Sequence, residues 1–280
     1  MWQPQTSDSR KVEYFKGVLF SWLNTRSVAA VNFFHSRMER IITYWLGTML
    51  LFALAKVAIA SSGETQIANL ASMIFPFLAV TMAPVLAYRI AATCFPLRDL
   101  ACQPSVRFCR YGQWRQLDCL EARRIPAFGP TGFMASLIAG MLLNVPFRTT
   151  EFMLAMPAMP ASAPTWATTM VGMMTLDVVT LNFFYTICFV MALRTAPLFP
   201  RMLVFTWLLD VIMQLQIAEK VTQTGNLPAT VATALHSLLS GNIEKVLISA
   251  AIWLPYLILS ERVNVTFRHR TRAKHAALAG

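Results

Sequence analysis

Charged side chains are scarce in this sequence. Only 13% of its 280 residues are Asp, Glu, Lys or Arg, compared with about a quarter in an ordinary soluble domain, and 56% are hydrophobic. This composition excludes an ordinary soluble globular protein. We therefore expect an all-α, polytopic protein in contact with a lipid bilayer.

Acidic residues are the scarcer charged class: 13 Asp and Glu stand against 24 Lys and Arg, for a formal charge of +11. A nucleic-acid-binding protein gathers its basic residues on one folded polar face. Here the basic residues lie between apolar runs. We expect no nucleic-acid partner, and we interpret the basic residues as signals of membrane topology.

The sequence also lacks the motifs of common enzymes. It contains no P-loop, dinucleotide fingerprint, serine nucleophile elbow or zinc-protease motif. None of the cysteines forms a C-x-x-C pair, and four of them fall in the basic loop that we place in the cytoplasm or at its membrane edge. Reduced thiols are the default there, and metal ligation is the alternative. We expect no enzymatic activity, catalytic residue, cofactor or metal site. The five cysteines are Cys94, Cys102, Cys109, Cys119 and Cys188.

Long apolar runs are what the sequence has in abundance. Most of them approach the ~20 residues that an α-helix needs to cross ~30 Å of hydrocarbon. The last run is short, and it spans the bilayer if Glu244 and Lys245 lie at the outer interface. We predict about six transmembrane helices, at residues 41–60, 67–88, 133–156, 167–193, 202–218 and 246–260.

The basic residues predict the orientation of these helices. They cluster before the first run, between the second and third, between the fourth and fifth, and after the last. With six spans, all these segments lie on one side. The positive-inside rule therefore places both termini in the cytoplasm, and we expect a bacterial inner-membrane protein.

Five parts follow from this pattern. Residues 1–40 predict an amphipathic helix in the lipid headgroup region or, alternatively, a soluble helix packed on the cytoplasmic loop. Residues 41–88 form a two-span part, 89–131 a basic cysteine-containing loop, 132–261 a four-span part and 262–280 a basic tail. No internal repeat supports a common transporter architecture.

The end of the last span carries a distinctive pattern of aromatic, basic and small residues. It consists of Trp253, Pro255, Tyr256, Ser260, Arg262, Val263, Thr266 and Phe267. The pattern resembles the ending of the bacterial multipass family DUF2569, and the resemblance extends over about residues 125–270. It implies a compact four-span membrane protein of unknown function, and it brings no catalytic residue with it.

The third apolar run carries a stripe at four-residue steps: Gly132, Ser136, Gly140, Asn144 and Arg148. Small residues at this spacing let two helices approach closely. We therefore predict a helix-packing seam that ends in an ion pair between Arg148 and Glu151. The alternative is that Arg148 faces an anionic headgroup or substrate in an outward-facing pocket.

Two acidic residues lie deep within apolar runs. We place Asp177 and Asp210 about 15 Å from the ends of their helices, and Gln214 continues the polar stripe of Asp210. An ionised carboxylate at this depth must be paired, hydrated or protonated. Two facing carboxylates that share a proton would suit a proton-coupled carrier. The structural alternative is that Arg148 or a backbone donor pairs with one aspartate while the other is a neutral hydrogen-bonding group.

Two functions agree with these features. The first is a non-enzymatic accessory subunit or assembly component of a larger envelope complex. It would have a protein partner or form a homo-oligomer, and its basic cytoplasmic segments would contact anionic lipid. The second is a small carrier or channel for a proton-coupled solute or a lipid, built around Asp177, Asp210 and Arg148.

Overall fold

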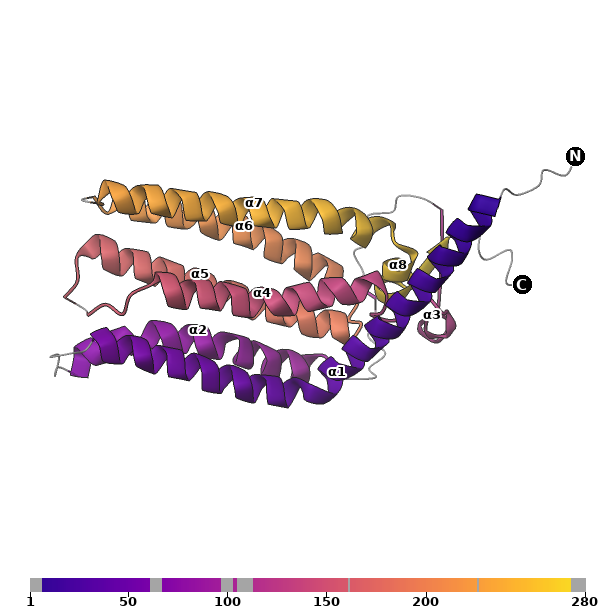
Figure 1. Ribbon diagram of the computed structural model, residues 1–280, viewed down its shortest axis with the longest axis horizontal. Coiled ribbons are helices and arrows are strands. Elements are labelled where there is room, and N and C mark those ends of the chain that lie inside the picture. Colours follow the sequence, from indigo (N-terminus) through magenta and orange to yellow (C-terminus); the bar gives the residue numbers. More distant parts are fainter. Residues whose placement is uncertain are drawn as a thin grey trace, which may run out of the picture.

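Six long helices form the body of the protein. The computed structural model describes residues 7–60, 67–96, 103–104, 113–160, 162–225 and 227–272. In Figure 1 the long helices lie side by side in one bundle, and the first part of α1 leaves the bundle at one end. The predicted all-α class is confirmed. The long helices are α1 (Ser7–Ala60), α2 (Ile67–Cys94), α4 (Phe133–Ala155), α5 (Thr165–Leu193), α6 (Phe199–Gln223) and α7 (Ala229–Leu259).

Five of these helices are long and apolar enough to cross a membrane. They contain the segments Asn24–Ala60, Asn69–Cys94, Thr165–Leu193, Phe199–Gln223 and Ala229–Leu259. Large apolar side chains such as Leu54, Phe75 and Ile252 point outward from the bundle and are exposed. A soluble monomer rarely exposes so much apolar surface. The chain is therefore a multi-pass membrane protein.

The remaining long helix, α4, contains the polar residues Asn144, Arg148 and Glu151. Its 23 residues give it a length of about 35 Å at 1.5 Å per residue. It packs against α1, α2 and α5. A buried face that includes Met134 and Ile138 makes these contacts, so neighbouring helices cover much of its surface.

Two helices extend beyond their predicted limits. The helix α1 runs without a break past residues 40 and 41, and the side chains of residues 1–23, where the headgroup helix was predicted, lie outside the described residues. The helix α7 begins at Ala229, and not near residue 246. Sixteen residues of helix therefore precede Lys245, so the predicted start of this helix was wrong.

A layer of polar side chains divides the core of the bundle. Along α6, Trp207 belongs to one hydrophobic cluster and Ile217 to another, and Asp210 and Gln214 lie between them. On α2 and α4, Thr81 and Thr149 lie between residues of the same two clusters. The buried polar residues of the layer are Thr81, Thr149, Asp177, Asn182, Asp210 and Gln214. The fold thus places its charged groups midway along the helices.

The loop after α2 and the tail after α7 meet at one end of the bundle. The strand β1 (Trp114–Gln116) pairs antiparallel with β2 (Arg270–Arg272), and the short helices α3 (Cys119–Arg124) and α8 (Glu261–Arg268) lie beside them. We call these four elements the terminal unit. Figure 1 shows it at the end of the bundle where the first part of α1 lies.

The distinctive ending of the sequence forms the contact between the terminal unit and the helices. The hydroxyl of Thr266 accepts a hydrogen bond from the Gly129 N–H at 3.0 Å. The Phe267 ring packs against Phe199, with ring centroids 5.0 Å apart. The Arg262 guanidinium donates to the Thr131 hydroxyl at 2.6 Å. The segment predicted as a basic tail therefore folds as far as Arg272.

The glycine at the start of α4 leads to a first prediction. Gly132 has φ +66° and ψ −140°, and its N–H donates to the Ser27 hydroxyl at 2.8 Å. Because residues with a side chain rarely adopt this conformation, we expect Gly132→Ala to lower stability by about 1–3 kcal/mol. Thermal unfolding in nanodiscs measures the loss.

Gly140→Ala is the matched control for this prediction. Gly140 lies inside α4, and a Cβ added there meets no atom within 4 Å. Alanine favours a helix over glycine by about 1 kcal/mol, so this variant should be at least as stable as the wild type. Equal unfolding temperatures for the two variants would contradict the positive φ at residue 132.

Candidate functional site

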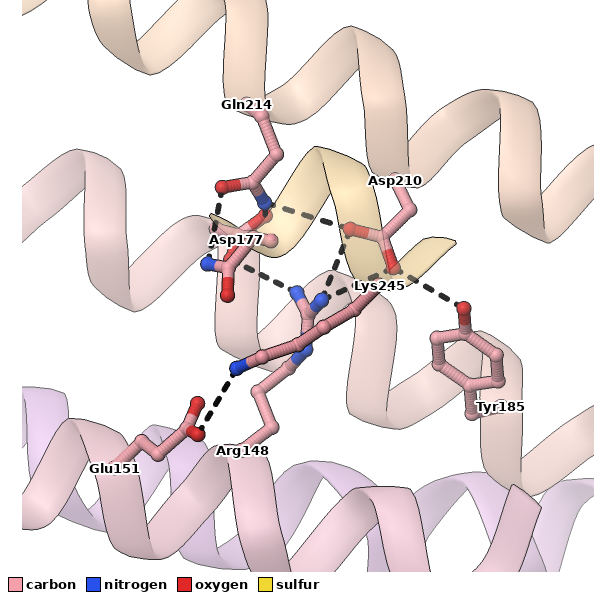
Figure 2. Close-up of polar contacts among 8 residues, drawn as sticks. Arg148, Glu151, Asp177, Tyr185, Asp210, Gln214 and Lys245 are labelled. Carbon is pink, nitrogen blue, oxygen red and sulfur yellow. Dashed lines mark hydrogen bonds and ion pairs between the residues drawn. The ribbon is translucent and has the colours of Figure 1, made fainter. Parts of the chain in front are cut away.

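The polar layer is organised around Arg148. Figure 2 shows its guanidinium between two carboxylates, Asp177 on α5 and Asp210 on α6. Nη1 donates to Asp177 Oδ2 at 3.0 Å, and Nη2 donates to the two Asp210 oxygens at 2.9 and 3.0 Å. The side chains of Asp177 and Asp210 are 2% and 0% exposed, and that of Arg148 is 12% exposed. The Arg148 guanidinium therefore pairs with both buried carboxylates.

Neutral groups complete the hydrogen bonding of this cluster. The Gln214 amide donates to Asp177 at 3.0 Å and to Asp210 at 3.4 Å. The Tyr185 hydroxyl donates to Asp210 at 3.1 Å, and the Asn242 amide of α7 donates to the Gln214 carbonyl at 3.3 Å. The helices α4 to α7 therefore all contribute to one network.

The charges of the cluster do not balance. One guanidinium and two carboxylates leave a net charge of −1 when both acids are ionised. The neighbouring pair, Lys245 and Glu151, joins α7 to α4 at 3.3 Å and is neutral in itself. An uncompensated charge in a low-dielectric interior is costly. The cluster can therefore accept one further positive charge, either as a proton or as a cation.

A cavity of about 400 Å³ gives access to this charge. It lies between α4 and α7, and Arg148, Tyr185 and Asp210 line it. Its lining includes the aromatic side chains of Phe147, Trp207 and Trp253 as well as Tyr185. At the terminal-unit end, Phe133 of α4 stacks on Trp253 of α7 at 4.8 Å between centroids. The cavity thus combines an excess negative charge with aromatic faces.

The structure brings together most of the predicted polar residues. Arg148, Asp177, Asp210 and Gln214 are in direct contact, and Asn144 lines the cavity. The structural alternative gave Arg148 to only one of the two acids, whereas the structure pairs it with both. The predicted ion pair between Arg148 and Glu151 was wrong, because Glu151 accepts from Lys245 instead.

Sequence reasoning missed Tyr185 and Asn242. Tyr185 follows Asp177 by eight residues, slightly more than two helical turns, so a search for polar residues on the same face would have found it. Asn242 had no such signal. Its segment was predicted to be a loop, whereas it lies within α7.

The predicted packing seam is not packed closely against another helix at Ser136 and Gly140. Ser136 and Gly140 are exposed, and Gly140 lines the cavity. Gly132 precedes the helix as its N-cap. The opposite face of α4, with Met134, is the buried one. Within a single chain this stripe is therefore no close helix contact, and a seam between two copies stays a prediction.

Three cysteines lie among the described residues. Cys94 is exposed, Cys119 is half-buried and Cys188 is buried, and all three are free thiols. Cys102 and Cys109 lie outside the described residues.

In the terminal unit, burial and the nearby Arg123 lower the pKa of His269 below its usual 6.5.

Comparisons of the chain with protein families, with curated proteins and with solved structures found no match. The resemblance to DUF2569 therefore stays a prediction from the sequence.

Proposed function

We propose that this protein is a proton-coupled carrier of small organic cations with six membrane spans. The observation that carries the proposal is the single guanidinium that serves two buried carboxylates beside a cavity, which Arg148, Asp210 and several aromatic side chains line. The carrier is a non-enzymatic protein of the bacterial inner membrane, and both termini lie in the cytoplasm.

The arrangement of the helices supports this topology. Six spans return the chain to the side from which it started, in agreement with the position of α1 and the terminal unit at one end of the bundle (Figure 1). Basic residues concentrate at that end. They include Arg26, Arg37, Arg115, Arg124, Arg194, Arg201, Arg268 and Arg272. The positive-inside rule assigns this end to the cytoplasm.

Charge competition supplies the coupling. A proton on either aspartate neutralises the cluster, and an organic cation in the cavity does the same. The cluster has only one excess negative charge to neutralise. A bound proton therefore weakens the binding of the organic cation, and a bound organic cation weakens the binding of the proton. Trp207 and Trp253 offer π faces that attract an organic cation by cation–π interaction. The ion pair between Lys245 and Glu151 spans the same two helices as the cavity and must separate if these helices move apart.

Tetraphenylphosphonium is a suitable probe for this proposal. The purified protein in phosphatidylcholine nanodiscs is titrated with the probe while tryptophan fluorescence and the pH of a weakly buffered solution are recorded. We expect saturable quenching together with proton release, because the cation displaces a proton from the cluster. Tetraphenylborate, an anion of similar shape, is the control and should not bind to the site. Equal binding of the two ions, or binding of the cation without proton release, would overturn the proposal.

An accessory subunit is the second candidate. The observation that favours it is the folded terminal unit, which presents the exposed Arg115, Arg124 and Arg272 beside the diverging part of α1 (Figure 1). This surface would suit an acidic protein partner, and the exposed stripe at Ser136 and Gly140 would suit a second copy. Isolation of the tagged protein from its native membrane in mild detergent, followed by mass spectrometry and sizing, tests this candidate. A stoichiometric partner supports it, whereas a lone particle that binds the phosphonium supports the carrier.

A further inference from the structure

A second cavity lies between α6 and α7 at the terminal-unit end. Its volume is about 510 Å³. Apolar side chains form its long walls: Val204, Phe205 and Leu208 on α6, and Leu254, Leu257 and Ile258 on α7. It shares no lining residue with the cavity beside Arg148. We call it the α6–α7 groove.

Among the described residues, the charged side chains that line this groove are arginines. Arg201 comes from α6, Arg268 from α8 and Arg270 from β2. The side chain of Asn264 orients two of them, because its Oδ1 accepts hydrogen bonds from Arg268 at 3.0 Å and from Arg270 at 2.8 Å. The Arg270 guanidinium also lies over the Trp114 ring, 4.7 Å from its centroid. Buried contacts thus hold basic groups at one end of an apolar groove.

The geometry points to an anionic glycerophospholipid as the occupant. We propose that its phosphate lies against Arg201, Arg268 and Arg270 while one acyl chain follows the groove between α6 and α7. Seven residues, or about 10 Å of helix, separate Arg201 from Leu208, so the apolar wall extends well beyond the basic end. Phe205, Leu208 and Leu254 are exposed and supply the surface for the chain.

Charge selects this lipid over the other occupants. The net negative charge of an anionic headgroup complements three guanidinium groups, whereas phosphatidylcholine has the same phosphate but its quaternary ammonium cancels that charge. A soluble phosphate would use the arginines and leave the apolar walls uncovered. The site therefore requires both the anionic headgroup and an acyl chain of the lipid. The inference depends on the bundle spanning a bilayer and is independent of carrier activity.

Native mass spectrometry can count the lipids that the protein retains. The protein is released from nanodiscs that contain equal amounts of phosphatidylglycerol and phosphatidylcholine. We expect one retained phosphatidylglycerol in the wild type. The double variant Arg201→Gln/Arg268→Gln should bind it about 30-fold more weakly, since each arginine near an anionic headgroup contributes about a 5-fold gain in affinity. The double variant Arg40→Gln/Arg124→Gln, with the same loss of charge at exposed positions outside the groove, should retain the lipid.

A third variant tests the apolar wall without changing the charge. Val204→Trp places a large ring in the groove, and we expect it to expel the lipid while the arginines remain. Inorganic phosphate should not displace the lipid from the wild type. Displacement by phosphate together with full retention in Val204→Trp would show an anion site only and overturn the proposal. Equal retention of phosphatidylcholine and phosphatidylglycerol, or equal loss from both double variants, would overturn it as well. Unchanged circular dichroism and particle size are required of each variant.

Discussion

Replacing Arg148 with glutamine is expected to destabilise the folded bundle by about 3–5 kcal/mol, the usual cost of removing one partner from a buried ion pair. The loss is large because Asp177 and Asp210 both pair with this guanidinium and are almost completely buried. Gln214 still donates to both acids, but an amide supplies no charge. Thermal unfolding in nanodiscs, followed by circular dichroism, measures the change.

Two further variants separate charge from packing. The triple variant Arg148→Gln/Asp177→Asn/Asp210→Asn removes all three charges and should regain most of the lost stability, because no uncompensated carboxylate remains. Glu151→Gln breaks the exposed ion pair with Lys245 and should cost less than about 1 kcal/mol. If Arg148→Gln unfolds at the wild-type temperature, the carboxylates do not depend on the guanidinium.

The members of the site with a formal charge were predictable from the sequence. Asp177, Asp210 and Arg148 interrupt long apolar runs, and charge is so costly in a membrane interior that each such residue requires a partner. Gln214 was found because it follows Asp210 by one helical turn. These arguments use only local spacing and the cost of desolvation.

The choice of partners was not predictable in the same way. Glu151 is three residues from Arg148 and is the nearest acid in the sequence, but it lies at an exposed position and pairs with Lys245. An exposed ion pair between residues that are close in the sequence contributes little to stability. The contacts formed when α5 and α6 pack against one another therefore decide the partners of Arg148. The cavity was also hidden, because it depends on the gap between α4 and α7.

The predicted start of α7 was wrong for a related reason. Asn242, Glu244 and Lys245 interrupt the apolar pattern of α7, so only the segment after them was predicted as a span. The helix continues through them since Asn242 and Lys245 have partners on α6 and α4. The strands β1 and β2 have three residues each and pair across more than 150 positions, so no local pattern identified them.

Asp210→Asn is expected to reduce the affinity for tetraphenylphosphonium about 100-fold and to abolish the accompanying proton release. The variant retains one carboxylate for Arg148, so the cluster becomes neutral. Two unit charges about 5 Å apart at an effective dielectric constant of about 20 interact by about 3 kcal/mol, which corresponds to this change in affinity. The fold should persist, because the asparagine carbonyl can still accept hydrogen bonds from Tyr185 and Arg148. Titration in nanodiscs, with thermal unfolding as the control for folding, gives both quantities.

Asp177→Asn is the matched comparison, because it makes the cluster neutral in the same way at a different position. Asp210 lines the cavity together with Tyr185, whereas Asp177 lies outside its lining. A cation in the cavity therefore lies closer to Asp210, and Asp177→Asn should weaken binding by only about 10-fold, as its charge acts over a longer distance. Proton release should disappear in both variants, since it depends on the net charge of the cluster. Wild-type affinity and proton release in Asp210→Asn would exclude the cluster as the coupling site, and a larger loss in Asp177→Asn would place the cation on the other side of Arg148.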